Sequence, residues 1–220
     1  MFIGHFAVAY AAKKASPRTS LGTLAFASQL PDILWPVFLL LGLERAAVAP
    51  GATAVTPLDF TSYPLSHSLL ADVGWGLLLA GVYFILKKNR RGSLMIFLCV
   101  VSHWVLDVIV HRPDLPLYPG SHVLLGLGLW NSRVGTVAVE MAMFAAGILI
   151  YLDATRARDR KGIWSFWGLN VVLVAIYFAN LFGPPPPSIN AVAYVGIAGG
   201  WLFVAWCAWI DRHRPPANIG

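Results

Sequence analysis

The sequence predicts an all-α fold, a polytopic bundle of six or seven transmembrane helices that forms one membrane domain over residues 1–220. Of the 220 residues, 58% are hydrophobic and only 12% are charged, about half the ~25% charged fraction of soluble domains. Apolar segments recur at lengths that can cross a ~30 Å hydrocarbon core at 1.5 Å per residue. These observations exclude a soluble enzyme, a disordered chain and a disulfide-stapled secreted domain.

Seven apolar segments follow one another, at residues 2–12, 21–43, 68–86, 94–111, 134–152, 163–183 and 190–210. The first is short, so it could cross only where the bilayer thins or where it packs partly against other helices. In the second, Pro31 and Pro36 remove backbone donors, so we expect a break or kink that turns polar backbone toward a cavity.

Basic residues gather in every second connection between these segments. They are Lys13, Lys14 and Arg18, then Lys87, Lys88, Arg90 and Arg91, then Arg156, Arg158, Arg160 and Lys161, and finally Arg212 and Arg214. The positive-inside rule therefore predicts that the N-terminus lies outside and the C-terminus in the cytoplasm. The same bias explains the net charge of +6, so we expect the lipid bilayer, and no nucleic acid, as the partner.

The remaining connections are predicted to lie on the outer side. Residues 44–67 are rich in Pro, Thr and Ala, and residues 112–133 contain an apolar stretch, 122–130, that is expected to be re-entrant or surface-lying. Residues 183–188 hold four consecutive prolines and are expected to form a stiff spacer. The sequence shows no repeat at a fixed period, which argues against inverted-repeat transporter folds.

Ionisable side chains inside apolar segments define the candidate site, because an unpaired one costs at least a few kcal/mol there. They are His5, Asp32, His67, Asp72, His103, Asp107, His111 and Glu140. His103, Asp107 and His111 are spaced four apart, so on a helix they form one stripe. Imidazole and carboxylate at this spacing can bind one divalent metal, and N and O donors suit zinc or manganese. A buried His–Asp pair that fills a polar gap between helices is the alternative.

Depth is the second argument for a common site. With the predicted orientation, His103 lies about 12 Å and Asp107 about 6 Å from the outer end of their helix, and Glu140 lies about 9 Å below the outer end of its own. Asp72 and Glu140 are expected either to make hydrogen bonds in packing or to orient ligands or transfer protons. His122 and Asp114 are expected to be solvated loop residues.

A set of short motifs in a fixed order points to a family. The motifs are Gly4-His5, Leu30-Pro31-Asp32, Ser66-His67-Ser68, Ser102-His103 with Asp107 four residues on, and Leu115-Pro116-Leu117-Tyr118-Pro119. They resemble those of the bacterial membrane-bound metal-dependent hydrolases, which include the YdjM-like, LexA-binding inner-membrane proteins. The resemblance covers about the first 120 residues. It implies a multi-pass inner-membrane protein whose metal site, in residues 1–122, is carried by His5, Asp32, His67, His103 and Asp107, while residues 123–220 add helices of unknown role.

The chain departs from the family's pattern in two places. Ile33-Leu34-Trp35 stands where the family has a second Asp and a His, and Ser62-Tyr63-Pro64 stands where it has His-Arg-Gly. Three potential ligands are therefore missing, which argues against a two-metal centre, although His111 could replace one of them.

Together the residues favour a membrane-embedded metal-dependent hydrolase, with zinc the expected metal. His5, His67, His103 and Asp107 are the expected ligands, Asp32 is a ligand or orients one, and His111 or Glu140 would be the general base or acid. The substrate would be a lipid or a lipid-linked ester or phosphoester.

Two other classes of protein stay open. A carrier of protons or metal ions would use intramembrane Asp, Glu and His as relay groups, although the inner half of the predicted bundle offers none. A non-catalytic scaffold would hold a structural metal in a closed site without an open position for water.

Overall fold

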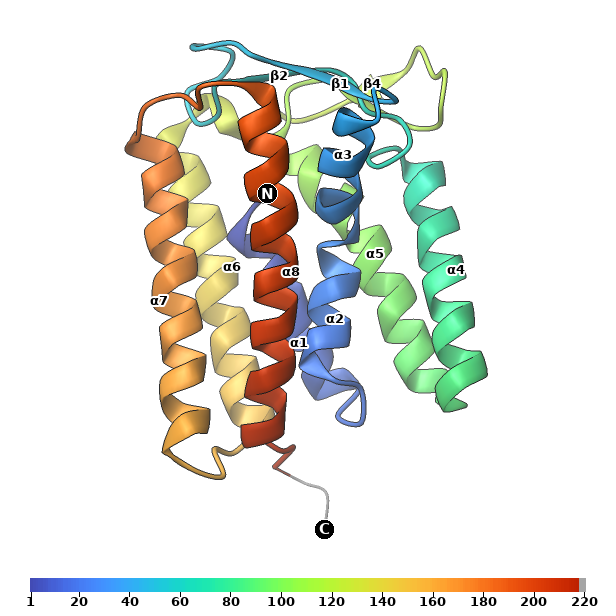
Figure 1. Cartoon of the computed structure of the whole chain (residues 1–220), viewed down its shortest axis with the longest axis vertical. Helices are drawn as coiled ribbons and strands as arrows, with labels where there is room; N and C mark the ends of the chain where they lie inside the picture. Colours follow the sequence, from blue (N-terminus) through green and yellow to red (C-terminus); the bar gives the residue numbers. More distant parts are fainter. Residues whose placement is uncertain (218–220) are drawn as a thin grey trace.

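The computed structural model describes residues 1–217, which fold into one helical bundle with small sheets at one end (Figure 1). Its helices are α1 (Ile3–Ala15), α2 (Leu21–Ser28), α3 (Leu30–Leu40), α4 (Leu69–Lys87), α5 (Arg90–Val110), the 3-10 turn η1 (Leu129–Asn131), α6 (Arg133–Ala154), α7 (Arg160–Phe182) and α8 (Ile189–His213). Strand β1 (Arg45–Val48) pairs antiparallel with β2 (Leu58–Ser62), and β3 (Leu115–Pro116) pairs antiparallel with β4 (Leu124–Leu125). The predicted all-α class is confirmed.

Within residues 1–217, five helices, α4 to α8, are long and apolar enough to cross a membrane. Helices α2 and α3 make a sixth span if they are counted together, with a bend of 54° between them. Helix α1 has 13 residues and is only about 20 Å long, too short for a ~30 Å core. It is instead enclosed by the bundle, with residues such as Ile3 and Tyr10 fully buried.

Polar residues between the apolar segments fix where most helices begin. The side-chain oxygens of Ser20, Ser68, Asn89, Ser132, Asp159 and Ser188 each accept a backbone N–H from the first turn of the following helix. Such caps satisfy groups that have no partner inside the helix. The start of α3 instead carries Pro31, whose missing N–H is not needed in a first turn. The predicted break in this segment is therefore confirmed, at Gln29.

Close helix contacts place the short α1 in the middle of the bundle. Gly147 on α6 lies so near α1 that a Cβ there would approach the Cα of Ala7 to 2.7 Å. Next to this contact, Tyr10 of α1 packs against Tyr151 and Phe166, with ring centroids 5.2 and 5.6 Å away. These contacts hold α1 against α6, through Gly147 and Tyr151, and against α7, through Phe166.

The basic connections lie at one end of the bundle and the small sheets at the other (Figure 1). At the basic end, Lys14 Nζ lies 2.8 Å from Asp153 Oδ2, and the Arg156 N–H donates to the Pro215 carbonyl. This arrangement agrees with the charge pattern, but which end faces the cytoplasm stays a prediction. Met1 is buried inside the bundle, so α1 begins within it and not at its outer surface.

The connection over residues 112–133 lies on the surface of the bundle, which is one of the two arrangements expected from the sequence. It runs across the hairpin end as β3, β4 and η1, and Leu127 is 77% exposed (Figure 1). The connection over residues 44–67 forms the β1–β2 hairpin, which the sequence pattern did not indicate. Both connections cover the end of the bundle at which α5, the helix that carries Asp107, ends (Figure 1).

Candidate metal centre

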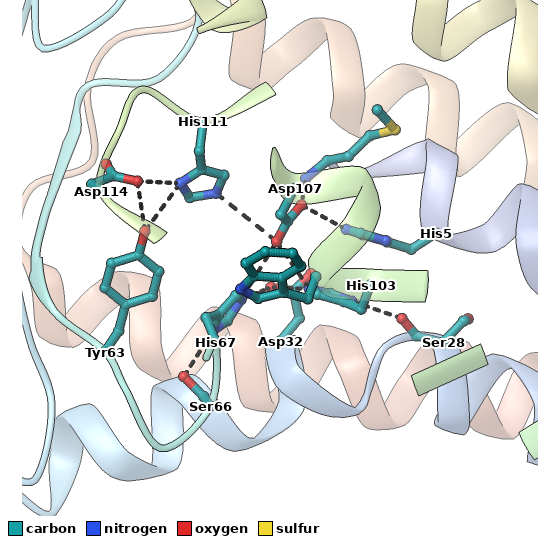
Figure 2. Close-up of polar contacts among 12 residues, drawn as sticks. His5, Ser28, Asp32, Tyr63, Ser66, His67, His103, Asp107, His111 and Asp114 are labelled. Carbon is teal, nitrogen blue, oxygen red and sulfur yellow. Dashed lines mark hydrogen bonds and ion pairs between the residues drawn. The ribbon is translucent and has the colours of Figure 1, made fainter. Parts of the chain in front are cut away.

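The five residues expected to bind metal converge on one another (Figure 2). His5 comes from the first turn of α1 and Asp32 from the first turn of α3; His67 precedes α4, and His103 and Asp107 lie one turn apart on α5. Asp107 is central: its carboxylate oxygens lie 3.1 Å from His5 Nε2, 3.3 Å from His103 Nε2 and 3.8 Å from His67 Nε2.

The donor atoms form two overlapping groups that could hold an ion. His5, His103 and Asp107 make one group and Asp32, His67 and His103 the other, each with its donor atoms within 4.8 Å of one another. Asp32 Oδ1 lies 3.4 Å from His67 Nε2 and 3.7 Å from His103 Nε2. All these side chains are buried except that of Asp32, which is 40% exposed. Imidazole and carboxylate donors at this density suit zinc.

The hydrogen bond of His103 shows which ring nitrogen is free. Its Nδ1 lies 2.8 Å from the Ser28 carbonyl, which can only accept, so Nδ1 carries the proton. Ser28 ends α2, and a carbonyl at a helix end lacks an intrahelical partner. His103 Nε2 then faces Asp32 and Asp107, and it makes no hydrogen bond within residues 1–217. Beside two carboxylates this nitrogen must either carry a second proton or bind a metal ion, because a bare lone pair would be repelled.

His67 is oriented by a relay that leads to the same result. Ser66 Oγ donates its proton to Glu44 Oε2 at 2.6 Å, so at 2.7 Å it can only accept from His67 Nδ1. Glu44 also accepts the backbone N–H groups of Leu65 and Ser66. The relay leaves His67 Nε2 directed at Asp32 and Asp107. Ligands of metal ions are typically held in this way by partners on the other ring nitrogen.

His111 stands one turn beyond Asp107 with its own support. Its Nδ1 lies 3.0 Å from Asp114 Oδ1, which also accepts from the Tyr63 hydroxyl at 2.6 Å. Burial, together with the Asp114 carboxylate, raises the pKa of Tyr63 above its usual range, so the hydroxyl stays a donor. His111 Nε2 is 3.9 Å from Asp107 Oδ2 and belongs to neither donor group. The expectation that Asp114 is solvated is wrong: its side chain is 12% exposed, because it binds these partners.

Glu140 supports α1 at the edge of the cluster. Its Oε2 accepts the backbone N–H groups of Phe2 and Ile3 at 3.0 and 3.1 Å. The α-amino group of Met1 in turn contacts Asp107 Oδ1. Glu140 thereby fixes the helix start that carries His5, and the proton-transfer role predicted for it stays a prediction.

Two other polar candidates do not join the donor groups. Asp72 on α4 is buried, and neither of its carboxylate oxygens has a hydrogen-bond partner in the described chain. His122 is exposed in the connection between β3 and β4. Sequence reasoning did not anticipate the roles of Ser28, Glu44 and Tyr63. An acidic residue directly after an apolar segment was the only signal for Glu44, and Ser28 and Tyr63 gave none.

The cluster opens into a cavity of about 630 Å³. Asp32, His67, Asp107 and His111 line it, together with apolar residues of α3, α7 and α8. The fold and this site define a multi-pass membrane protein with a buried His–Asp cluster that faces an internal cavity.

The sequence matches the YdjM inner membrane protein family over residues 1–183, and the chain belongs to this family. The match runs beyond the first 120 residues, which hold the motifs, and ends before α8. Family membership and the spanning helices place the protein in the inner membrane as a multi-pass protein surrounded by lipid. No curated protein and no solved structure matches the chain.

Proposed function

We propose that the protein is a membrane-embedded metal-dependent hydrolase that cleaves an ester or phosphoester bond of a lipid or lipid-linked substrate. One observation carries the proposal. The Nε2 atoms of His67 and His103, in rings each held by a hydrogen bond on the opposite nitrogen, are directed at the same two carboxylates, Asp32 and Asp107. The atoms present therefore fit a divalent cation, and zinc suits them best.

The ligand roles follow from burial. The side chains of Asp107, His5, His67 and His103 are almost fully buried and would hold the cation, whereas that of Asp32 is 40% exposed and would bind it on the substrate side. A bound zinc ion would supply a Lewis acid and lower the pKa of water toward ~7.

Proton transfer is best assigned to His111. Asp114 accepts a hydrogen bond from His111 Nδ1, so His111 Nε2 is free to take a proton from water and return it to a leaving oxygen. His111 also lines the cavity, where the scissile bond would lie. Glu140 lines the same cavity and is the second candidate for this role, although one of its oxygens already binds the start of α1.

The cavity favours an enzyme over a scaffold with a structural metal. A structural zinc site is closed by four protein ligands, whereas a catalytic site keeps a position for water. Here Asp32, Asp107 and His111 all face the cavity. The carrier alternative has less support, because Tyr10, Phe144 and Phe166 pack together deep in the hydrophobic core.

Elemental analysis of the protein purified in mild detergent tests the proposal. We expect bound zinc in the wild type and in the control His122→Ala, and loss of zinc in His103→Ala and Asp107→Asn. The zinc-containing protein should also release products from an inner-membrane lipid extract, and both cluster variants should not. A wild type without metal, or cluster variants with unchanged metal content, would falsify the proposal.

A further inference from the structure

The cavity beside the cluster has an apolar wall that the proposed chemistry does not use. The residues of this wall come from three helices: Ile33 and Pro36 of α3, Ile176 of α7, and Val192, Val195 and Phe203 of α8. The cavity has a volume of about 630 Å³, which lies within the ~300–1,000 Å³ typical of ligand sites. An apolar wall next to a polar cluster fits a ligand with one polar and one apolar part.

The cavity reaches the surface of the bundle along α8. Val195 lines the cavity and is also 71% exposed, in a helix that is long and apolar enough to span the membrane. In a bilayer, the molecules that meet this surface are lipids and not water. A ligand could therefore enter sideways between helices.

Glycines on α8 widen the part of the cavity that runs along this helix, here called the groove. Gly196 and Gly199 line the cavity, and a Cβ at either position would meet only ordinary contacts, 3.5 Å from Pro36 and 3.7 Å from Phe203. Helix packing therefore does not require these two glycines. Gly200 differs, because a Cβ there would lie 3.0 Å from Ile33. The space at Gly196 and Gly199 is room for an occupant.

Two buried donors in the cavity wall lack partners. Within the described residues, the Tyr177 hydroxyl and Gln29 Nε2 make no hydrogen bond, although the side chains are only 4% and 6% exposed. Both residues line the cavity. Buried donors are normally satisfied, so an occupant with acceptor oxygens at these positions would complete them.

We propose that the cavity binds a phospholipid from the surrounding bilayer, with one acyl chain in the groove along α8 and its ester or phosphate oxygens at Tyr177 and Gln29. Its role as the substrate of the cluster rests on the proposed function, whereas its binding can be tested separately. Seven of the residues that line the cavity lie on α8, which is outside the residues matched by the family.

Photocrosslinking tests the site directly. The probe is phosphatidylethanolamine with a diazirine in one acyl chain, added to the full-length protein in nanodiscs, and the labelled residues are mapped by mass spectrometry. We expect labelling of residues 191–203 and of Ile176, with competition by unlabelled phosphatidylethanolamine. Labelling confined to the outward surface of α4, at residues such as Leu77 and Leu78, would overturn the proposal. Equal competition by a free fatty acid of the same length would overturn the assignment to a phospholipid.

Two variants with matched controls separate the groove from the donors. Gly199→Leu should fill the groove and reduce cavity labelling at least fivefold, whereas Gly81→Leu, on an open face of α4, should not. Tyr177→Phe should weaken probe binding roughly three- to tenfold through loss of one hydrogen bond. Its control, Tyr151→Phe, removes a hydroxyl that is equally buried and unpartnered in the described chain but does not line the cavity.

Metal content measured on the same samples keeps the two proposals apart. We expect all four variants to retain the wild-type metal. If the wild type holds no metal but Gly199→Leu still abolishes cavity labelling, the hydrolase proposal fails and the lipid site stands. If metal is bound but neither Gly199→Leu nor Tyr177→Phe changes labelling, the lipid site fails and the hydrolase proposal stands.

Discussion

The imidazole of His5 lies flat against the imidazole of His103, with ring centroids 3.6 Å apart and ring planes 7° apart. The stack joins α1 to α5 at the cluster. Two charged rings would repel each other at this distance, so the contact argues against protonation of both rings at once, and a shared metal would require both to be neutral. A helix too short to span the membrane is thus placed where its first turn supplies a ligand.

Replacing Ser66 by Ala should weaken metal binding roughly 10- to 100-fold while the protein stays folded. The change removes the hydroxyl that links His67 Nδ1 to Glu44, so the ring loses its fixed orientation. Competition with a chromogenic chelator measures the affinity. Ser121→Ala is the control, because its hydroxyl bonds only within an exposed loop. Equal affinity in Ser66→Ala and the wild type would show that the relay does not support the ligand.

Removing the metal with EDTA should lower the melting temperature of the wild-type protein. An ion that binds only the folded state adds about 2.7 kcal/mol at a free concentration 100 times its Kd. Tryptophan fluorescence can follow the transition, since the chain holds nine tryptophans. Asp107→Asn should melt at the same temperature with and without EDTA. A wild type that is insensitive to EDTA would contradict the prediction.

Gly147→Ala should destabilise the protein by about 1–3 kcal/mol, because overpacking forces backbones apart. The new Cβ would lie 2.7 Å from the Cα of Ala7, at the contact between α1 and α6. Thermal unfolding in detergent measures the effect. Gly81→Ala, where nothing lies within 4 Å, should be neutral or slightly stabilising. If both variants melt alike, α1 is not packed as closely as described.

The predicted orientation can be tested with cysteine labelling in intact cells. A membrane-impermeant maleimide should label His122→Cys at the hairpin end and should not label Lys161→Cys at the basic end. The native Cys99 and Cys207 are buried and should give little background. The reverse pattern of labelling would show that the hairpin end faces the cytoplasm.

The candidate ligands could be predicted from sequence because each is an ionisable side chain in an apolar segment. An unpaired ionisable side chain there costs free energy, so it rarely occurs by chance. The spacing of His103 and Asp107 already placed them on one helix face, and α5 confirms that they lie one turn apart. The break before α3 followed equally directly from Pro31.

The supporting residues could not be predicted in the same way. Glu44, Tyr63 and Asp114 lie in connections, where a polar residue is unremarkable until the fold shows what it contacts. Tyr63 reaches Asp114 across 51 positions of the chain, and no local pattern encodes such a pair. The hairpin of β1 and β2 was missed because its strands are short and do not alternate clearly between apolar and polar residues.

The polar cluster and the apolar wall of the cavity come from different parts of the chain, and this separation has an evolutionary consequence. The polar cluster is assembled from residues 5 to 111, whereas much of the apolar wall comes from residue 176 onward. Mutations in that wall can accumulate without altering a single cluster residue. Selection could therefore change which molecules the cavity binds while the cluster itself is inherited unchanged.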